Sequence, residues 1–285
     1  MSLRALTGIL FTICLIANTS PTRADEPVPT HETLQVESTK LGETRVINVW
    51  VPPGYVAGKK SGYPVLYMPD GGIKEDFPHV VATVDSLVHS GSIPPMLVVG
   101  IENTQRRRDM TGPTEVAEDL KTAPVIGGSG AFRAFIADEL MPTIRKRYAV
   151  NDKSAIIGES VAGLFIVETF FLKPNLFDTY IALDPSLWWN NEQWTREAGS
   201  RLDGMGQINA RLLLASADAT GNGQVTVNLV EALCQHPKAG LVWTHLPRPD
   251  LRHDNIYKGL EKTVLALAFS SKFESTKNCP DTSVH

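Results

Sequence analysis

The sequence lacks the features that mark most cofactor-dependent proteins. It has no cluster with metal-ligand spacing, no glycine-rich phosphate loop and no dinucleotide fingerprint, so we expect no metal and no cofactor. Its formal net charge is only -4, which gives no general electrostatic reason to bind nucleic acid or anionic lipid. Low-complexity tracts and internal repeats are also missing, and 42% hydrophobic residues are enough to build a full core.

No stretch is long and apolar enough to predict a membrane span, which needs about 20 residues. The best candidate, 5–17, is broken by threonine and glycine. It follows Arg4 and precedes a polar run ending at Ala24, which is the three-part layout of a secretory signal. We therefore expect cleavage after Ala24 and a periplasmic or secreted mature chain, 25–285, without stable membrane insertion.

Cysteine is scarce. Of three cysteines, Cys14 lies in the expected signal, which leaves Cys234 and Cys279 in the mature chain. In an oxidising compartment these two thiols can form one disulfide. The alternative is a buried Cys234 in a helix and a free Cys279 in the C-terminal tail, and the sequence leaves both interpretations open.

Apolar periodicity alternates between strand and helix along the whole mature chain. Strands are predicted at 44–51, 64–68, 95–101, 154–157, 179–183, 210–215 and 241–246, and helices at 80–89, 131–148, 161–171, 225–234 and 257–269. This alternation predicts one α/β domain, 25–285, with a mostly parallel sheet and helices on both faces. The segment 188–206 is the one candidate for a partial cap. Ligands of such sheets bind at the carboxyl ends of the strands.

The stretch KSAIIGESVAGLFIVETFF combines a short apolar strand, a turn of small residues around Ser160 and an apolar helix. This is the context of a nucleophile elbow, in which small residues two before and two after the nucleophile let strand and helix approach. Gly158 and Ala162 fill those positions. A serine that merely begins a helix is common, but the whole context predicts Ser160 as a nucleophile. The N–H of Val161 is then an expected oxyanion donor.

A glycine-rich turn, PDGG at 69–72, directly follows the strand YPVLYM. In α/β-hydrolases the second oxyanion donor lies in the loop after such a strand, and glycine lets the backbone turn its N–H inward. The N–H groups of Gly71, Gly72 and Ile73 are candidates, and we predict Gly72. An ordinary Asp-Gly turn is the alternative interpretation.

Four motifs occur in a familiar order: YMPDGGIKEDFPHV, VVGIENTQRRRDMTGPT, IIGESVAGLF and IALDPSLWW. Together they resemble the esterase family of α/β-hydrolases that includes the siderophore esterases and, more distantly, S-formylglutathione hydrolase and mycolyltransferases. The resemblance runs from the first strand to the last helix. It implies an α/β-hydrolase fold with little or no cap, a serine esterase acting on a small-molecule ester, a nucleophile at Ser160 and an oxyanion loop at 70–72.

The fold requires the catalytic groups in the chain order serine, acid, histidine. After the expected seventh strand, where family members often carry Glu, the chain reads LLLASADATGN and offers Asp218; after the eighth it reads PRPDLRHDNIY and offers His253. We predict His253 as general base and Asp218 as its orienting acid. His245 lies inside the strand VWTHL, where a buried structural histidine is the better interpretation. Asp250, Glu231 or a dyad without an acid stay open.

Two groups are candidates for substrate contact. Arg108 ends the run RRR after the strand LVVGI, where it either meets an anionic or catechol-bearing substrate or belongs to a solvated charge cluster. Trp188 and Trp189 follow the strand YIAL and either form an apolar wall over the substrate or belong to the core.

Three functions fit these observations. The leading hypothesis is hydrolysis of a carboxylic ester through an acyl-enzyme. The first alternative is acyl transfer to an alcohol, which differs in how well the site excludes water. The second is a catalytically impaired relative that binds a ligand, because the acid and histidine tracts depart from the family pattern.

Overall fold

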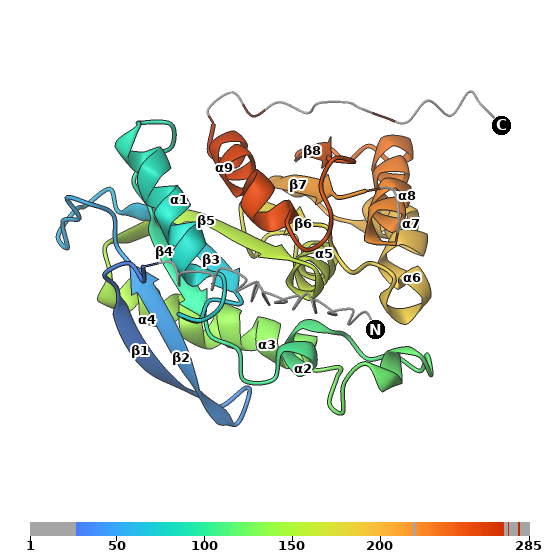
Figure 1. The fold of residues 1–285 in the computed structure, drawn as a ribbon, viewed down its shortest axis with the longest axis horizontal. Helices are drawn as coiled ribbons and strands as arrows, with labels where there is room; N and C mark the ends of the chain where they lie inside the picture. The colour runs from blue at the N-terminus through green and yellow to red at the C-terminus, as the bar shows by residue number, and fades with distance from the viewer. Residues whose placement is uncertain (1–26, 219–220, 271–272, 274–278, 280–285) are drawn as a thin grey trace, which may run out of the picture.

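The computed structural model describes residues 27–218, 221–270, 273 and 279 (Figure 1). Its strands are β1 (Glu32–Ser38), β2 (Glu43–Trp50), β3 (Tyr63–Pro69), β4 (Leu97–Ile101), β5 (Val150–Glu159), β6 (Thr179–Leu183), β7 (Ala210–Ser216) and β8 (Leu241–Pro247). They form one eight-stranded sheet in the order β1-β2-β4-β3-β5-β6-β7-β8. β2 pairs antiparallel with β1 and β4, and every other neighbouring pair is parallel.

Helices cover both faces of the sheet (Figure 1). Helices α1 (Phe77–His89) and α9 (Ile256–Ala268) share one hydrophobic cluster with one face. The opposite cluster includes α3 (Ser129–Phe135), α4 (Met141–Arg147), α5 (Val161–Leu172), α6 (Trp189–Arg196), α7 (Ala198–Gly204) and α8 (Asn222–Gln235). Short elements α2 (Arg106–Met110) and η1 (Asp119–Lys121) lie in the connection between β4 and α3. The α/β class with helices on both faces is confirmed.

Three details differ from the predicted elements. Strand β1 was not predicted, although Leu34 and Val36 alternate with exposed residues and pack against the core. The helix predicted at 131–148 is divided by a π-helical turn, η2 (Ile136–Leu140), which ends two residues before Pro142 near the start of α4. Proline has no N–H to continue the regular helical ladder, which accounts for a change of winding there. The segment 188–206 forms α6 and α7, whose apolar side chains join the main core.

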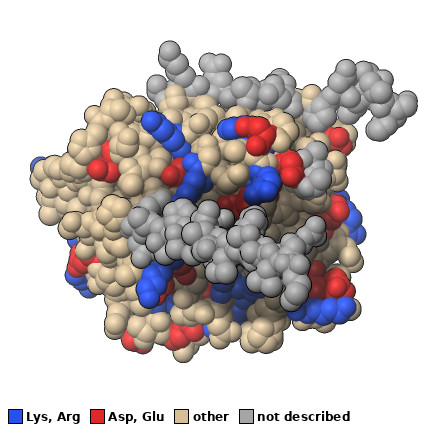
Figure 2. Space-filling view, viewed as in Figure 1, with Lys and Arg blue, Asp and Glu red and all other residues tan. Residues whose placement is uncertain are grey.

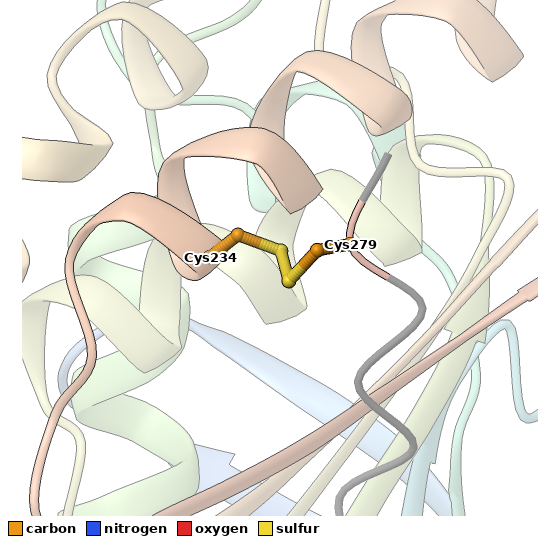
Figure 3. The surroundings of a disulfide bond; sticks show 2 residues. All are labelled: Cys234 and Cys279. Atoms are coloured by element: carbon orange, nitrogen blue, oxygen red, sulfur yellow. A yellow bond between two sulfur atoms is a disulfide. The ribbon is translucent and has the colours of Figure 1, made fainter. Parts of the chain in front are cut away.

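One disulfide joins Cys234 at the end of α8 to Cys279 (Figure 3). Their Cα atoms are 5.9 Å apart and the bond closes a sequence separation of 45 residues. Of the two interpretations that the sequence left open, the structure therefore shows the disulfide. The closed loop contains β8 and α9, so the bond restrains the elements on either side of His253.

A buried histidine ties α1 to α9. His79 Nδ1 lies 2.5 Å from Glu261 Oε2, and its Nε2 lies 3.1 Å from Asp76 Oδ1. Burial by itself lowers the pKa of His79, but the hydrogen bonds to the two carboxylates raise that pKa to about 9. The imidazole is therefore charged at neutral pH, and it joins two carboxylates inside the protein.

Acidic and basic side chains are interspersed on the face of the molecule seen in Figure 2. Within the described part of the chain, no helix is long and apolar enough to cross a membrane.

Candidate active site

Ser160 lies at the sharp turn between β5 and α5. Its backbone has φ 61° and ψ -119°, a strained conformation for a residue with a side chain. Two backbone hydrogen bonds hold it there, from the Ser160 N–H to Leu183 O at 3.0 Å and from the Ser186 N–H to Ser160 O at 2.9 Å. A Cβ at Gly158 would lie 2.6 Å from that of Ala162, so the strand and helix approach only because this position is glycine. The geometry is that of the predicted elbow.

His253 lies in the loop between β8 and α9 and faces the serine. Its Nε2 is 3.0 Å from Ser160 Oγ, within hydrogen-bond distance. Its Nδ1 is 2.6 Å from Asp184 Oδ2. The hydrogen bond to Asp184 raises the pKa of His253, burial opposes this effect, and the charge of Glu159 raises the pKa further. The side chain is 49% exposed, so water reaches it.

The carboxylate on His253 Nδ1 is that of Asp184, which corrects the prediction of Asp218. Asp184 directly follows β6, with φ 42°, and its own N–H donates to Ala215 O at 2.8 Å. Its Oδ1 accepts from the Ala217 N–H at 2.9 Å, and the side chain is almost completely buried. The sequence DPS after a buried strand was a usable signal, because an acid there also satisfies the order serine, acid, histidine.

The other titratable candidates have different positions. Asp218 lies after β7, donates its N–H to Leu251 O at 3.0 Å, and lines the same hollow of about 430 Å³ as Asp184 and His253. His245 is buried in β8 with its Nε2 2.8 Å from Ser216 Oγ, and burial lowers its pKa to about 4. It is the structural histidine that its place in the strand predicted.

Asp250 forms an exposed ion pair with Arg248 at 2.6 Å, and Glu231 lies within α8. Neither is the carboxylate that the structure places on the Nδ1 atom of His253.

The backbone N–H groups of Val161 and Gly72, the two predicted oxyanion donors, differ in whether they already donate a hydrogen bond within the protein. No described residue accepts a hydrogen bond from the N–H of Val161, the first residue of α5. The N–H of Gly71 donates to the carbonyl at the end of β4, which removes it as a candidate. The Gly72 N–H donates to Glu75 Oε2 at 2.7 Å, so the predicted donor is occupied by a carboxylate. A glutamate that reaches back three residues to a backbone N–H resembles a helix-capping arrangement.

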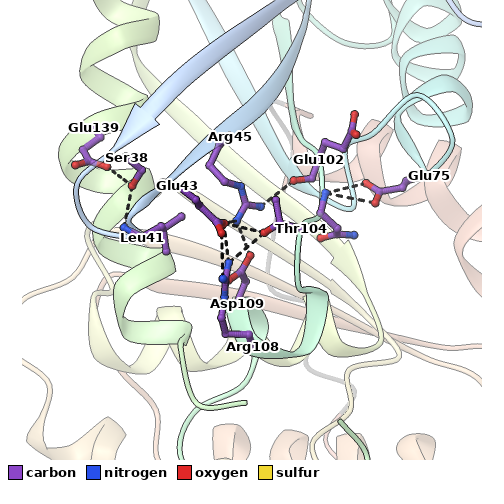
Figure 4. Close-up of polar contacts among 11 residues, drawn as sticks. Ser38, Leu41, Glu43, Arg45, Glu75, Glu102, Thr104, Arg108, Asp109 and Glu139 are labelled. Carbon is purple, nitrogen blue, oxygen red and sulfur yellow. Dashed lines mark hydrogen bonds and ion pairs between the residues drawn. The ribbon is translucent and has the colours of Figure 1, made fainter. Parts of the chain in front are cut away.

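Arg108 belongs to an ion cluster, which corresponds to the second of the two interpretations that the sequence left open for this residue (Figure 4). Its Nη2 lies 2.7 Å from Glu43 Oε1 and its Nε lies 2.7 Å from Asp109 Oδ1. Fully buried Arg45 contacts the same Asp109 at 2.5 Å. The cluster fastens α2 to β2, and its hydrogen bonds raise the pKa of Arg108, first through Glu43 and then through Asp109.

Arg106 is the arginine of the run that reaches the candidate site. It binds Asp70 through two hydrogen bonds of 2.7 and 2.8 Å, and its Nη2 lies 3.4 Å from the backbone carbonyl of Glu159. Asp70 also accepts from Asn103 Nδ2 at 2.5 Å. The side chain of Glu159, one residue before Ser160, places Oε1 3.4 Å from His253 Nε2. Burial raises the pKa of Glu159 to about 7. Within the arginine run the sequence favoured Arg108 over Arg106, and Glu159 was not predicted as a site residue.

The two tryptophans do not form the predicted wall as a pair. Trp189 is only 1% exposed and donates from Nε1 to Gly112 O at 3.0 Å, so it is a core residue. Trp188 is half-buried and packs against it, with 5.9 Å between ring centroids. Both residues follow β6 at the carboxyl edge of the sheet, as predicted, but Trp189 begins helix α6 and its side chain lies in the core.

Known proteins with similar sequences are esterases. The "Putative esterase" family model matches residues 38–234, well over half of the chain. The ferri-bacillibactin esterase BesA of Bacillus subtilis is 31% identical over 168 residues, which cover 52% of this chain and 56% of BesA. A siderophore triacetylfusarinine C esterase of Aspergillus fumigatus is 37% identical over 91 residues, 30% of this chain and 29% of that protein. The matched segments thus span just over half the length of BesA and under a third of the length of the fungal esterase.

Solved structures show the same architecture. An IroE-like serine hydrolase from Shewanella oneidensis superposes with a TM-score of 0.71 at 26% identity, covering 81% of this chain and 79% of the other. The BES protein from Bacillus cereus superposes with a TM-score of 0.74 at 21% identity, covering 89% and 100%, which supports the fold. With the elbow at Ser160 and the sheet order described above, these matches show that the chain is an α/β-hydrolase-fold member of the esterase family.

Proposed function

We propose that the protein is a serine esterase that hydrolyses carboxylic esters through an acyl-enzyme. The observation that carries this proposal is the continuous hydrogen-bonded relay from Ser160 Oγ through His253 to Asp184. The ligand-binding alternative rested on altered sequence around the acid and the base. The relay is complete despite those alterations, which supports catalysis.

In the proposed reaction, His253 Nε2 takes the proton of Ser160 Oγ as that oxygen attacks the ester carbonyl carbon. Asp184 holds the Nδ1–H tautomer and stabilises the imidazolium. The imidazolium then protonates the leaving alcohol, which gives the acyl-enzyme. A water molecule attacks next, with His253 again taking a proton, and the acid product leaves as Ser160 recovers its own.

The half-exposed His253 favours water as the second nucleophile. Acyl transfer requires a site that excludes water from the acyl-enzyme. Here 49% of the imidazole is accessible, so we propose hydrolysis over transfer. Product analysis in the presence of an added alcohol separates the two reactions.

The oxyanion hole is proposed to combine the N–H groups of Val161 and Gly72. Use of Gly72 requires the Glu75 carboxylate to leave it, because that N–H already donates to Glu75 at 2.7 Å. Glu75→Ala is therefore expected to raise kcat severalfold, since it frees a donor and removes a negative charge beside the developing oxyanion. Glu102→Ala, which removes a neighbouring carboxylate that does not bind this N–H, is the control. Unchanged or lower kcat in Glu75→Ala alone would exclude Gly72 as a donor held back by Glu75.

For the substrate, we propose a small-molecule ester of the kind named in the relatives' descriptions, a siderophore ester. Support comes from the match to esterases of ferri-bacillibactin and triacetylfusarinine C. A panel of p-nitrophenyl acetate, p-nitrophenyl butyrate and a ferric siderophore trilactone tests this. Turnover of the simple esters without any siderophore hydrolysis would retain the chemistry and reject the substrate class.

The nucleophile is tested by covalent labelling. A fluorophosphonate should label the wild type stoichiometrically at Ser160, and Ser160→Ala should lose both labelling and ester turnover while its circular dichroism spectrum stays native. Turnover near the wild-type rate in Ser160→Ala would reject the nucleophile and, with it, the proposed function.

Export is proposed as well, with cleavage after Ala24 and a mature catalytic domain in the periplasm or outside the cell. The signal lies outside the described residues. The disulfide supports an oxidising compartment, where such bonds persist. Intact-mass measurement of exported protein should show the chain beginning at Asp25, and retention of Met1 would contradict the proposal.

A further inference from the structure

The nitrogen that accepts the serine proton faces two oxygen atoms. His253 Nε2 lies 3.0 Å from Ser160 Oγ and 3.4 Å from Glu159 Oε1. The opposite nitrogen, Nδ1, is held by Asp184 at 2.6 Å. The imidazole therefore lies between two carboxylates, one for each ring nitrogen, and the relay described above uses only one of them.

Within the part of the chain that the structure describes, the Glu159 carboxylate binds one cationic side chain. Among the described residues, its ion-pair partner is His253 alone. The nearby Arg106 guanidinium is engaged by Asp70 and reaches only the backbone carbonyl of Glu159. The Glu159 side chain is 18% exposed, so solvent screens its charge only in part.

We propose that Glu159 is a positioning residue for the general base, a second carboxylate that stabilises the imidazolium form of His253 from its Nε2 side. The inference rests on the proposed esterase function and adds a group to it. When Ser160 gives up its proton, the new Nε2–H bond lies beside a carboxylate oxygen before the proton passes to the leaving alcohol. Glu159 acts through charge and does not itself take the proton.

Two opposing consequences follow from this geometry. An ionised Glu159 stabilises the imidazolium in the transition state, which raises the rate. The same charge stabilises the imidazolium of the resting enzyme, which moves the pH at which the base becomes available upward. Among the described residues, the other charged groups that act electrostatically on the pair are Arg106, Asp184 and Asp76, and burial raises the pKa of Glu159 to about 7. Because the two groups are 3.4 Å apart, the titration of each depends on the charge of the other.

The test is the pH profile of kcat/KM for Glu159→Gln, which removes the charge and keeps the shape. We expect the acid limb to move to lower pH by about half a unit or more, because a unit charge at this distance has an effect of that size even when screened. We also expect the rate on the plateau to fall. A merely structural role lowers the plateau without moving the limb, so an unmoved limb overturns the inference.

Further variants make the result specific. Glu159→Met also removes the charge and should shift the limb equally if glutamine is poorly tolerated. Glu159→Asp keeps the charge and should leave the limb closer to the wild type. The matched control is Asp254→Asn, which removes an exposed carboxylate next to His253 that pairs with Arg252 and should move the limb much less. A shift in Asp254→Asn as large as that in Glu159→Gln would overturn the inference.

A measurement without substrate separates this inference from the proposed function. The His253 imidazole is titrated by NMR in histidine-labelled protein, with its signal assigned by loss in His253→Ala. Glu159→Gln should lower the His253 pKa, and an unchanged pKa overturns the inference whatever the enzymatic activity. Absence of ester turnover and of fluorophosphonate labelling in the wild type would instead reject the proposed function.

Discussion

Replacing Asp184 by asparagine isolates the role of one oxygen atom. Asp184 has φ 42°, and asparagine tolerates this left-handed backbone about as well as aspartate does. The amide oxygen can still accept the Ala217 N–H, which now donates to Oδ1 at 2.9 Å. The amide NH₂ then replaces the oxygen that lies 2.6 Å from His253 Nδ1.

This exchange inverts the hydrogen bond at the base. The NH₂ group donates to Nδ1, which leaves the proton of the neutral imidazole on Nε2, the nitrogen that must accept from Ser160 Oγ 3.0 Å away. The same change in a serine protease lowers kcat about 10⁴-fold, and we expect a loss of about 10³- to 10⁴-fold here. That range corresponds to about 4–5.5 kcal/mol of transition-state stabilisation.

The assay compares Asp184→Asn with Asp218→Asn. The kcat/KM for p-nitrophenyl butyrate and the rate of fluorophosphonate labelling should both fall by this factor in Asp184→Asn. Thermal unfolding should show that the variant is still folded. In Asp218→Asn both rates should stay within about tenfold of the wild type, because this carboxylate is not the one on Nδ1. A large loss in Asp218→Asn together with near-normal Asp184→Asn would refute the assignment.

Three further perturbations have expected outcomes. His253→Ala should lower kcat by several orders of magnitude at little change in stability, whereas His245→Ala should destabilise the fold by about 2 kcal/mol and leave the acid limb of the rate profile in place, since burial already keeps that imidazole neutral. The raised pKa of His79 contributes about 3 kcal/mol to the free energy of unfolding; this contribution is fully present below pH 6.5, the pKa in the unfolded chain, and is lost as the pH rises through about 9. Urea unfolding across this pH range should show the loss. In His79→Gln the free energy of unfolding should depend less on pH over the same range. Cys234→Ser should lower the unfolding free energy by about 4 kcal/mol for a closed loop of 45 residues, and a reductant should reproduce this in the wild type but not in the variant.

Local sequence determined the elements and the elbow that carries the proposed nucleophile. Strand and helix periodicities are properties of neighbouring residues, so β6 was predicted at its observed bounds and most other elements within a few residues. The elbow was also readable, because its steric demand falls on residues two positions either side of Ser160. Position 158 must be glycine because β5 and α5, which are adjacent in the sequence, approach closely there. Such a contact can be recognised from residues only a few positions apart.

The acid that pairs with His253 was harder to predict, because the two residues come from loops after different strands. Asp184 and Asp218 each follow a parallel strand at the same edge, and both satisfy the order required along the chain. Their difference lies in direction: the turn at Asp184 points its carboxylate at His253 Nδ1, 69 positions away in the sequence. No local pattern distinguishes two acids whose contacts depend on where a third loop lies.

The run of three arginines, 106–108, also shows what the sequence predicts and what depends on the tertiary structure. Three consecutive arginines are equivalent by composition, and the sequence placed them correctly at the functional edge. Helix α2 then points successive side chains in different directions, since neighbours on a helix do not share a face. Arg106 therefore meets Asp70 beside the nucleophile while Arg108 meets Glu43 on β2. The sequence by itself determined the fold and the elbow at Ser160 through short-range sterics and periodicity, and only the tertiary structure decided which distant charges surround this serine.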